Sequence, residues 1–501
     1  MEFSKEWLFL KIKELLNALN SLVLNVNCDL ETEIKHISSY SRDLKEETLF
    51  ICREGLTFDS HSIIDKLYDQ GVKVFIVEKE VSSFFPHIQV VDSRIAEAVI
   101  ASEFYGKPFE KLITFGVTGT NGKTTCTHLF HHIMHSLGYK GSISGTVLND
   151  IMGDKFYHHN TTPSSIEILR NMAKTVNNGG QYYGMEVSSH ALAQYRVESI
   201  RFDVVGITNI TRDHLDFHKT FEDYKKAKLH ILNLLKPEGV AIVNHEYLKD
   251  IKNNNVRIVT FGVDRNSDYV IKEVTTNWSG TFFKLDTPYG PKSISSQLIG
   301  EYNAFNITLV LAALVEIGYD IDEVINVIST FRGVDGRFEI IHEARKLGIE
   351  VIVDFAHTPD ALEKIILSLR KLSKGRIITV FGAGGQADKG KRPMMGEIAS
   401  KYSDIAIITT DDPRGEDPNK IIKDVEKGLV PGSLSLSIVD RREAIETAIT
   451  LANKGDVVLI AGRGHEPYQI FDDNYKKPFK DRDVAIDIIF QKINKGEKTF
   501  K

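Results

Sequence analysis

The chain has 501 residues, about three times the usual domain size, so we expect two or three domains rather than one core. With 42% hydrophobic and 26% charged residues it has the composition of a globular protein, and its net charge of −6 argues against the basic surface of a nucleic-acid-binding protein. The apolar runs are too short to cross a bilayer, and the odd set of Cys28, Cys52 and Cys126 supports no disulfide framework. We therefore expect a cytoplasmic protein with neither membrane nor nucleic-acid partners.

Short apolar runs alternate with helical patterns along the chain, which is typical of α/β proteins. The runs TLFICR and VKVFIVEK indicate a small α/β unit that ends near Gly106 and Pro108. From residue 109 the alternation favours βα units around a mostly parallel sheet. After residue 335 a third series of apolar runs ends in glycines or acids, as in Rossmann-like sheets. We predict three domains, at 1–108, 109–335 and 336–501.

The segment 116–125, GVTGTNGKTT, lies between an apolar strand and a helical pattern. Glycines at this spacing let backbone N–H groups turn toward phosphate oxygens, and the start of the helix adds a partial positive charge. Lys123 supplies a full charge, and the Thr124 hydroxyl can reach a magnesium ion. The segment predicts a nucleotide-binding loop with these candidate residues: Gly119, Thr120, Asn121, Gly122, Lys123, Thr124 and Thr125.

The form Gly-Thr-Asn-Gly-Lys-Thr-Thr resembles the Mur ligase family. These are ATP-dependent enzymes that join amino acids to UDP-linked muramoyl precursors of peptidoglycan, and folylpolyglutamate synthases share a similar loop. Further motifs follow in the family's order from about residue 37 to residue 483. The resemblance implies an N-terminal UDP-binding domain, a central ATP-binding domain and a C-terminal amino-acid-binding domain.

The resemblance also implies two magnesium sites. Glu186, after the run YYGM, resembles the metal-binding glutamate of the family, and a carboxylate suits magnesium. His214 resembles the histidine that ligates a second magnesium, and Lys228 resembles the lysine that takes up carbon dioxide as a carbamate. That modification needs a neutral amine, hence a depressed pKa. The implied metal ligands are Thr124, Glu186, His214 and carbamylated Lys228, and the implied catalytic residues are Lys123, Lys228, His214 and Arg337.

Further residues complete the ATP site by resemblance. Asn303 and Asn306 correspond to asparagines near the adenine, although they could instead cap the helix that follows. Arg337 resembles the arginine that reaches the ATP phosphates, a contact that suits its planar fork. Asp354 and His357 resemble residues near the ribose.

A third group of polar residues resembles the family's contacts to the UDP-muramoyl peptide. These candidates are Ser41, Asn160, Thr161, Thr162, Ser188, Gln194 and Arg196. The N-terminal part departs from the family pattern, since Tyr40 stands where aspartate is usual and Ser60 where glycine is usual.

The segments DDPRGEDP at 411–418 and GRGHE at 462–466 resemble the amino-acid pocket of the family member that adds the third, diamino residue of the stem peptide. The candidates are Asp411, Asp412, Arg414, Gly462 and Glu466. Enzymes that add meso-diaminopimelate usually have asparagine at position 412 and arginine at position 387, where this chain has Asp412 and Ala387. The local charge is thus lower by about two units, which disfavours the second carboxylate of diaminopimelate and favours lysine. Arg414 argues the other way, and meso-diaminopimelate and D-lysine remain alternatives.

Together these residues predict a monomeric, ATP-dependent ligase of peptidoglycan synthesis. It would move the ATP γ-phosphoryl group onto the D-glutamyl carboxylate of UDP-MurNAc-L-Ala-D-Glu, and the amine of the diamino acid would attack the resulting acyl phosphate. The alternative enzyme is a folylpolyglutamate synthase-like ligase, against which the N-terminal unit and the DDPR and GRGHE segments argue. A P-loop protein that only binds ATP and changes shape would leave those segments unexplained.

Overall fold

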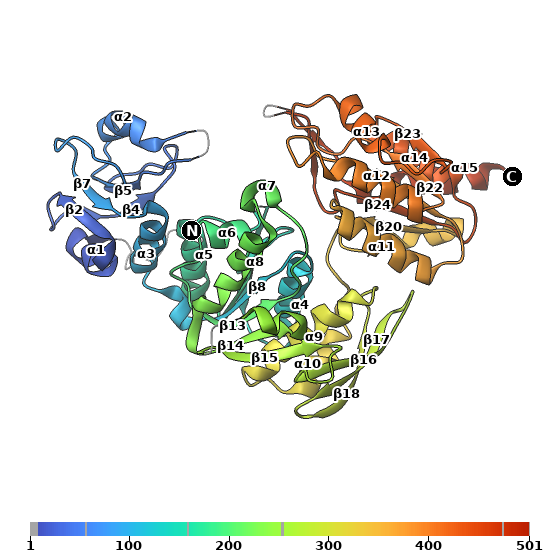
Figure 1. The fold of residues 1–501 in the computed structure, drawn as a ribbon, viewed down its shortest axis with the longest axis horizontal. Coiled ribbons are helices and arrows are strands. Elements are labelled where there is room, and N and C mark those ends of the chain that lie inside the picture. Colours follow the sequence, from blue (N-terminus) through green and yellow to red (C-terminus); the bar gives the residue numbers. More distant parts are fainter. Residues whose placement is uncertain (1–8, 56–57, 158–159, 252–254, 473–474, 500–501) are drawn as a thin grey trace. The chain divides into compact units, whose positions relative to one another are not determined.

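The computed structural model describes residues 9–55, 58–157, 160–251, 255–472 and 475–499. It divides into two compact units, Met1–Tyr269 with Thr308–Val327, and Val270–Ile307 with Ile328–Lys501. Both units combine helices with mostly parallel sheets, so the predicted α/β class is confirmed (Figure 1). Among the helices described, none is long and apolar enough to cross a membrane.

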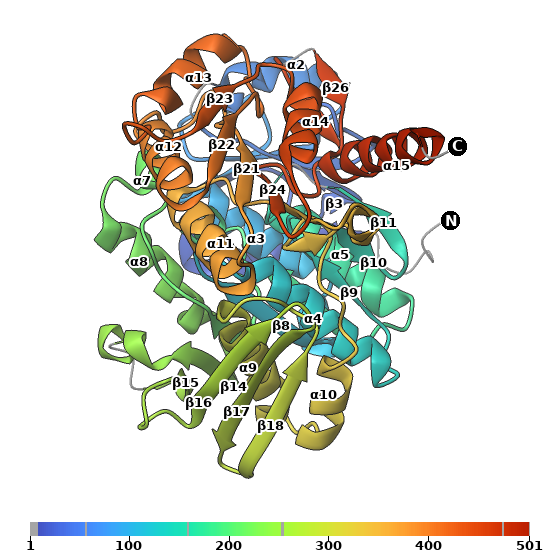
Figure 2. The ribbon, with the colours of Figure 1, turned by 90° about the vertical axis from the view of Figure 1, so that its right-hand side faces the viewer.

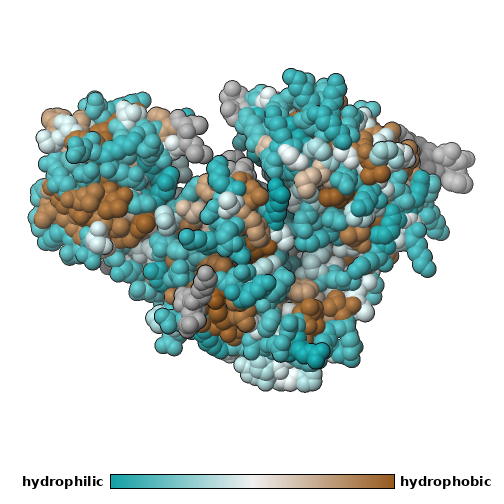
Figure 3. Space-filling model, viewed as in Figure 1, coloured by the Kyte–Doolittle hydropathy of each residue, from teal (hydrophilic) through white to brown (hydrophobic). Residues whose placement is uncertain are grey.

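The N-terminal part of the first unit is built on a five-stranded sheet of order β2-β7-β6-β5-β4. Its strands are β2 (Val23–Asn27), β4 (His36–Ser38), β5 (Thr48–Ile51), β6 (Val74–Val77) and β7 (His87–Val90); β1 (Leu10–Lys11) and β3 (Glu33–Ile34) form a separate pair. The helices are α1 (Ile12–Leu19), α2 (Ile64–Asp69) and α3 (Ser93–Phe104), with 3-10 turns η1 (Asn20–Leu22) and η2 (Ser60–Ile63). Leu24 and Val26 are exposed on edge strand β2, and Figure 3 shows hydrophobic surface over this part of the chain.

The central sheet of the first unit runs in the order β11-β10-β9-β12-β8-β13-β14-β15. Its strands are β8 (Ile113–Thr118), β9 (Gly141–Ser144), β10 (Asn149–Ile151), β11 (Asp154–Phe156), β12 (Tyr182–Glu186), β13 (Phe202–Ile207), β14 (Leu235–Asn244) and β15 (Arg257–Gly262). The helices are α4 (Lys123–Ser136), α5 (Ser165–Asn177), α6 (Ser189–Ala193), α7 (Leu215–His218) and α8 (Phe221–Leu229), with η3 (Pro108–Lys111), η4 (His230–Leu234) and η5 (His245–Asp250). Strand β8 pairs in parallel with β12 on one side and β13 on the other, so the carboxyl ends of all three meet at one edge.

Three antiparallel strands follow in the sequence: β16 (Tyr269–Asn277), β17 (Gly280–Thr287) and β18 (Gly290–Ser296). Figure 2 shows them side by side. Helices α9 (Tyr302–Glu316) and α10 (Ile321–Ile328) come next.

The C-terminal sheet has the order β19-β20-β24-β21-β22-β23 and is parallel except for β19. Its strands are β19 (Glu339–Ile340), β20 (Glu350–Asp354), β21 (Ile377–Phe381), β22 (Ile405–Ile408), β23 (Ser435–Ser437) and β24 (Val457–Ala461). The remaining elements are η6 (His342–Leu347), α11 (Pro359–Leu372), α12 (Lys391–Tyr402), α13 (Pro418–Glu426), α14 (Arg441–Leu451), α15 (Asp481–Thr499) and the hairpin β25 (Tyr468–Ile470) and β26 (Lys476–Pro478).

Alternating residues of these strands enter two different cores, which explains their continuous apolar runs. Val351 and Val353 of β20 pack with α14 and α15, whereas Ile352 between them packs with α11, α12 and α13. Helices therefore cover both faces, and ligand-facing loops are left to the carboxyl edge of the sheet. The predicted domain boundaries at 108 and 335 stay predictions.

Candidate active site

The phosphate loop lies between β8 and α4, where the sequence predicted it. Gly119 and Gly122 have φ of 152° and 92°. A Cβ at Gly119 would lie 1.8 Å from the Thr208 hydroxyl, so only glycine fits there. Lys123 Nζ donates to the carbonyls of Gly119 and Thr120 at 2.7 and 3.0 Å. The ammonium group is therefore held over the loop, where phosphates bind in such structures.

The end of β13 shapes the loop from the other side. Asn209 Oδ1 accepts from the Asn121 N–H at 2.9 Å, and its Nδ2 donates to the Asn121 carbonyl at 3.0 Å. The Thr208 hydroxyl also donates to that carbonyl, at 2.6 Å. All three contacts go to the backbone N–H or carbonyl of Asn121. They therefore fix the shape of the loop.

Glu186 lies at the carboxyl end of β12, beside the start of α4. It accepts from the Thr124 hydroxyl at 3.0 Å and from the N–H and hydroxyl of Thr146 at 2.8 and 3.1 Å. The side chain is buried. The structure thus brings together the hydroxyl and the carboxylate predicted to bind magnesium, and these are the hard oxygen donors that this ion prefers.

Lys228, on α8, is buried and donates to the Gly119 carbonyl at 2.8 Å. Its Nζ lies 4.6 Å from the centre of the Tyr224 ring, and the Tyr224 hydroxyl is 2.9 Å from that of Thr120. Burial and the nearby charge of Lys123 hold the pKa of Lys228 well below its usual value. The structure therefore supplies the depressed pKa that carbamylation of this lysine requires.

His214 precedes α7 with φ of 52°, and its Nε2 lies 3.3 Å from Asp213 Oδ2. Its ring packs at 4.7 Å from that of His190 and at 6.4 Å from that of Tyr224. Tyr224 links His214 to the phosphate loop, so the predicted metal residues of the first unit lie around one edge of the sheet.

The second unit holds the other predicted nucleotide residues. Asn303 and Asn306 are buried in α9; Asn306 Nδ2 donates to Asn303 Oδ1 at 3.0 Å, and Asn303 Nδ2 donates to the Ile299 carbonyl at 2.9 Å. Asn303 lies inside the helix and uses its amide as a donor to a carbonyl, so the helix-capping alternative is wrong for this residue.

Asp354, Arg337 and His357 gather at the end of β20. The Asp354 carboxylate accepts from the N–H groups of Phe338 and Ala356 at 2.6 and 2.7 Å. Arg337 stacks 4.4 Å from the centre of the Phe355 ring, and His357 Nδ1 lies 2.8 Å from the Phe355 carbonyl. Burial raises the pKa of Asp354, against the charge of Arg337.

Five of the seven predicted contacts to the UDP-muramoyl peptide form a connected group at the end of β12: Thr161, Thr162, Ser188, Gln194 and Arg196. The Ser188 N–H donates to Thr162 Oγ1 at 3.0 Å, and the Thr162 hydroxyl donates to the Glu186 carbonyl at 2.9 Å. Arg196 donates to the Thr162 carbonyl at 2.7 Å and to Gln194 Oε1 at 2.6 Å. Thr161 joins through Thr146, because the hydroxyl oxygens of the two residues lie 3.1 Å apart. Ser41 lies apart from these bonds, exposed after β4, and Asn160 is likewise exposed.

The predicted amino-acid residues meet at the carboxyl edge of the second unit's sheet. Arg463, completely buried, forms an ion pair with Asp412 and lies 4.0 Å from Asp411 and 3.6 Å from Glu466. A Cβ at Gly462, where φ is 115°, would lie 2.5 Å from Asp411 Oδ2. Arg414 Nη2 lies 3.6 Å from Asp412 Oδ2 and is 45% exposed. Burial raises the pKa of Glu466 to about 8.

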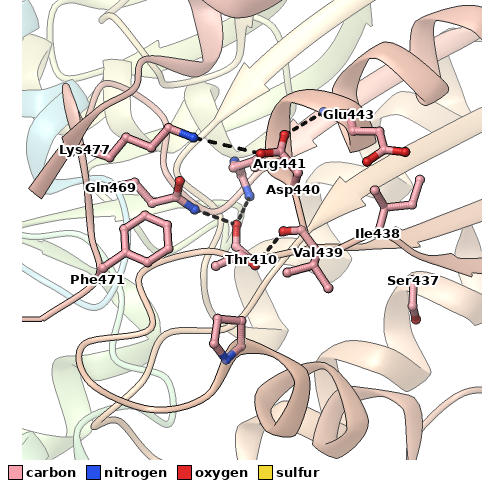
Figure 4. Close-up of a pocket in the computed structure, with 11 residues that line it drawn as sticks. Thr410, Ser437, Ile438, Val439, Asp440, Arg441, Glu443, Gln469, Phe471 and Lys477 are labelled. Carbon is pink, nitrogen blue, oxygen red and sulfur yellow. Dashed lines mark hydrogen bonds and ion pairs between the residues drawn. The ribbon is translucent and has the colours of Figure 1, made fainter.

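A cavity of about 540 Å³ lies next to this group (Figure 4). Thr410, Asp440, Gln469, Phe471 and Lys477 are among its lining residues, and no predicted amino-acid residue lines it. Gln469 Nε2 donates to the Thr410 and Asp411 carbonyls, and the Thr410 hydroxyl donates to the Val439 carbonyl. The side chains of Gln469 and Thr410 are thus hydrogen-bonded to backbone carbonyls beside the cavity.

Sequence reasoning missed several residues of the site. Thr146 and Tyr224 join the groups around Glu186 and Lys228, but neither stands in a motif that marks a role. Arg463 lies within the segment GRGHE and Asn209 lies five residues before His214, so a signal for both was present in the sequence. Their partners, Asn121 and Asp412, are brought to them by the fold alone.

Comparisons with known proteins agree with this arrangement. Residues 117–314 match the Mur ligase middle domain, and residues 336–464 match the Mur ligase glutamate ligase domain. A curated relative from Bacillus cereus is 38% identical over 93% of this chain and 96% of its own length. One from Clostridium acetobutylicum is 40% identical over 89% of this chain and 92% of its own. Both are named UDP-N-acetylmuramoyl-L-alanyl-D-glutamate–2,6-diaminopimelate ligase, the latter with the number 1.

Solved structures show the same fold. A structure of a UDP-N-acetylmuramoyl-L-alanyl-D-glutamate–2,6-diaminopimelate ligase, 27% identical, covers 96% of this chain and 99% of its own with a TM-score of 0.67. The MurF ligase of Thermotoga maritima in complex with ADP, 19% identical, covers 93% and 98% with a TM-score of 0.61. A folylpolyglutamate synthase of Mycobacterium tuberculosis, 16% identical, covers 74% and 92% with a TM-score of 0.59. The last two likenesses concern the fold alone.

The fold, the phosphate loop and the loops around it define a P-loop ligase. The chain belongs to the Mur ligase family, as its motifs predicted.

Proposed function

We propose that this chain is the ATP-dependent ligase that adds a diamino acid to the D-glutamyl residue of UDP-MurNAc-L-Ala-D-Glu in peptidoglycan synthesis. The observation that carries the proposal is the name shared by relatives 38–40% identical over about nine tenths of the chain or more. The DDPR and GRGHE segments, which meet around Arg463, support it against the folylpolyglutamate synthase alternative.

The reaction begins with a carboxylate, which is a poor electrophile. Transfer of the ATP γ-phosphoryl group to the D-glutamyl carboxylate breaks the bond between the γ-phosphorus and the bridging oxygen, releases ADP and gives an acyl phosphate. The amine of the diamino acid then attacks the acyl carbon, loses a proton and expels inorganic phosphate. Lys123, held over the loop by two carbonyls, is placed to exchange them for phosphate oxygens. Arg337, beside Phe355, is the second proposed phosphate-binding cation.

The oxygen donors around the phosphate loop fit magnesium. Thr124, Glu186, His214 and Lys228 as its carbamate would hold the ions, which neutralise phosphate charge when bound. Lys228 fits this set of ligands only as its carbamate. A buried ammonium group beside Lys123 would repel a cation, whereas a carbamate would bind it. We propose that Lys228 carries this modification: its neutral amine forms an N–C bond to carbon dioxide and loses one proton to solvent.

For the amino acid we propose meso-diaminopimelate rather than the lysine favoured by the sequence. Lysine was favoured because Asp412 adds a negative charge to the pocket. In the structure, the buried ion pair with Arg463 neutralises this charge. Arg414 is 45% exposed and 3.6 Å from Asp412, so it remains accessible to a second carboxylate of the substrate. Ala387 remains the argument for lysine.

Phosphate release by the purified enzyme tests both parts of the proposal. With ATP, magnesium and UDP-MurNAc-L-Ala-D-Glu, we expect release only when a diamino acid is added, and faster with meso-diaminopimelate than with equal L-lysine or D-lysine. Faster release with lysine would refute the choice of amino acid alone. Activity with a folate and glutamate instead would refute the whole proposal. We also expect a monomer, which light scattering of the same sample measures.

A further inference from the structure

Three arginines of the first unit lie near one another, and one of them is paired with a buried carboxylate. Arg53, in the segment after β5, forms an ion pair with Glu97 of α3 and donates to the Ser39 hydroxyl. The Glu97 side chain is 2% exposed and that of Arg53 is 28% exposed. Arg53 is therefore anchored by a buried partner while part of its side chain reaches the surface.

The other two arginines come from α3 and from the segment after α6. Arg94 is exposed, and its Nη2 donates to the Glu54 carbonyl at 3.1 Å, next to Arg53 in the sequence. Burial raises the pKa of Glu97, against the charges of Arg53 and Arg196. Burial lowers the pKa of Arg196, and the charges of Arg53 and Arg94 lower it further, so these arginines lie near one another. The cluster thus joins the N-terminal sheet to the Thr162 loop, to which Arg196 donates at 2.7 Å.

The charges of this cluster do not cancel. Of the three arginines, Arg53 is paired with the Glu97 carboxylate, whereas the nearby Glu54 and Asp59 form their ion pairs with Lys79. The Arg53 Nε is buried and has no hydrogen-bond partner among the described residues. A guanidinium has five donors in a fixed fork, and Arg53 makes both of its contacts, to Glu97 and to Ser39, through Nη2, so this partly exposed group has donors left for an anion.

We propose that Arg53 and Arg94, together with Arg196, bind the diphosphate of the UDP-linked substrate, with Glu97 as the positioning residue that holds Arg53. This inference rests on the proposed function, which supplies a substrate with a diphosphate. A diphosphate carries two adjacent negative charges, which match the excess of positive charge in the cluster, and arginine forks bind such oxygens in pairs. Arg196 and the Thr162 loop place the cluster beside the proposed site of the muramoyl peptide.

Calorimetric binding of UDP-MurNAc-L-Ala-D-Glu, UDP and UMP to the full chain tests the proposal. For Arg53→Met we expect binding of the two diphosphates to weaken about 10- to 100-fold, as for lost charged hydrogen bonds, and binding of UMP to change much less. The KM for ATP should stay at the wild-type value. Arg53→Lys, which keeps the charge but not the fork, should give an intermediate loss.

The double variant Arg53→Met with Glu97→Gln separates binding from folding, because it also removes the buried charge that Arg53 neutralises. We expect it to keep the full loss of diphosphate affinity. Recovery of wild-type affinity would show that Arg53 only neutralises Glu97, and equal losses for UDP and UMP would show that it does not bind the diphosphate. Arg345→Met, which breaks an exposed pair with Glu350, is the matched control and should change nothing.

The same titrations distinguish this inference from the proposed function. If the wild-type chain binds none of the three uridine ligands, the proposed function fails and this inference fails with it. If the wild type binds UDP-MurNAc-L-Ala-D-Glu and Arg53→Met binds it equally well, only the diphosphate site is refuted.

Discussion

Replacing Asp412 by alanine should destabilise the second unit through Arg463. The Asp412 carboxylate accepts from this completely buried guanidinium and from the Ile470 N–H at 3.0 Å. Removing one partner of a buried ion pair costs about 3–5 kcal/mol. The Asp411 carboxylate stays at 4.0 Å from Arg463, so we expect the lower end, about 3 kcal/mol.

Urea unfolding followed by tryptophan fluorescence measures this change. The chain has two tryptophans, Trp7 and Trp278, so the measurement uses a Trp7→Phe background. Trp278 packs against the core formed by α11 and α12, so its signal reports the second unit. Asp412→Asn keeps an acceptor and should cost less than Asp412→Ala. Asp487→Ala, which breaks an exposed pair with Arg442, is the control and should cost less than about 1 kcal/mol. An Asp412→Ala protein as stable as the control would refute the argument that Arg463 depends on Asp412.

Three further predictions concern the site. Lys228→Met should lower kcat about 1000-fold, as the loss of a charged catalytic group does. The melting temperature should stay equal or rise because a buried amine is removed, and an unchanged kcat would exclude a role for this lysine. The pKa of Glu466 is raised from 4.5 to about 8, so between these pH values the folded state keeps a proton that the unfolded state releases. The stability of the wild type should therefore fall as pH rises through this range, whereas that of Glu466→Gln should not. Parallel stability profiles would contradict this. Gly119→Ala should weaken ATP binding at least tenfold, since its Cβ would lie 1.8 Å from Thr208 Oγ1, and adding Thr208→Ala should recover part of the loss. A Gly119→Ala protein with wild-type ATP affinity would refute the steric argument.

Much of the fold was readable from the sequence because the strands of the C-terminal sheet are buried on both faces. Val351, Ile352 and Val353 enter alternate cores, so the apolar run is continuous and marks a strand. The phosphate loop was equally readable, since its glycines and Lys123 stand together in the chain.

Contacts between distant segments were not readable. The charge of Asp412 is visible in the sequence, but its partner Arg463 is set by the fold. The local charge that favoured lysine therefore left out a neutralising cation. Arg53 and Glu97 present the same difficulty, because neither stands in a recognisable motif and only the packing of α3 beside β6, which pairs with β5, brings them together.

The resting position of Lys123 bears on product release. Its ammonium group donates to the Gly119 and Thr120 carbonyls, and Lys228 donates to the same Gly119 carbonyl. Nucleotide binding has to exchange the two Lys123 bonds for bonds to phosphate, and departure of ADP forms them again. Each bond of this charged kind contributes about 1.5–3 kcal/mol to whichever state contains it. These bonds compete with phosphate for the same ammonium group, so they lower the affinity of the loop for ADP and for ATP alike.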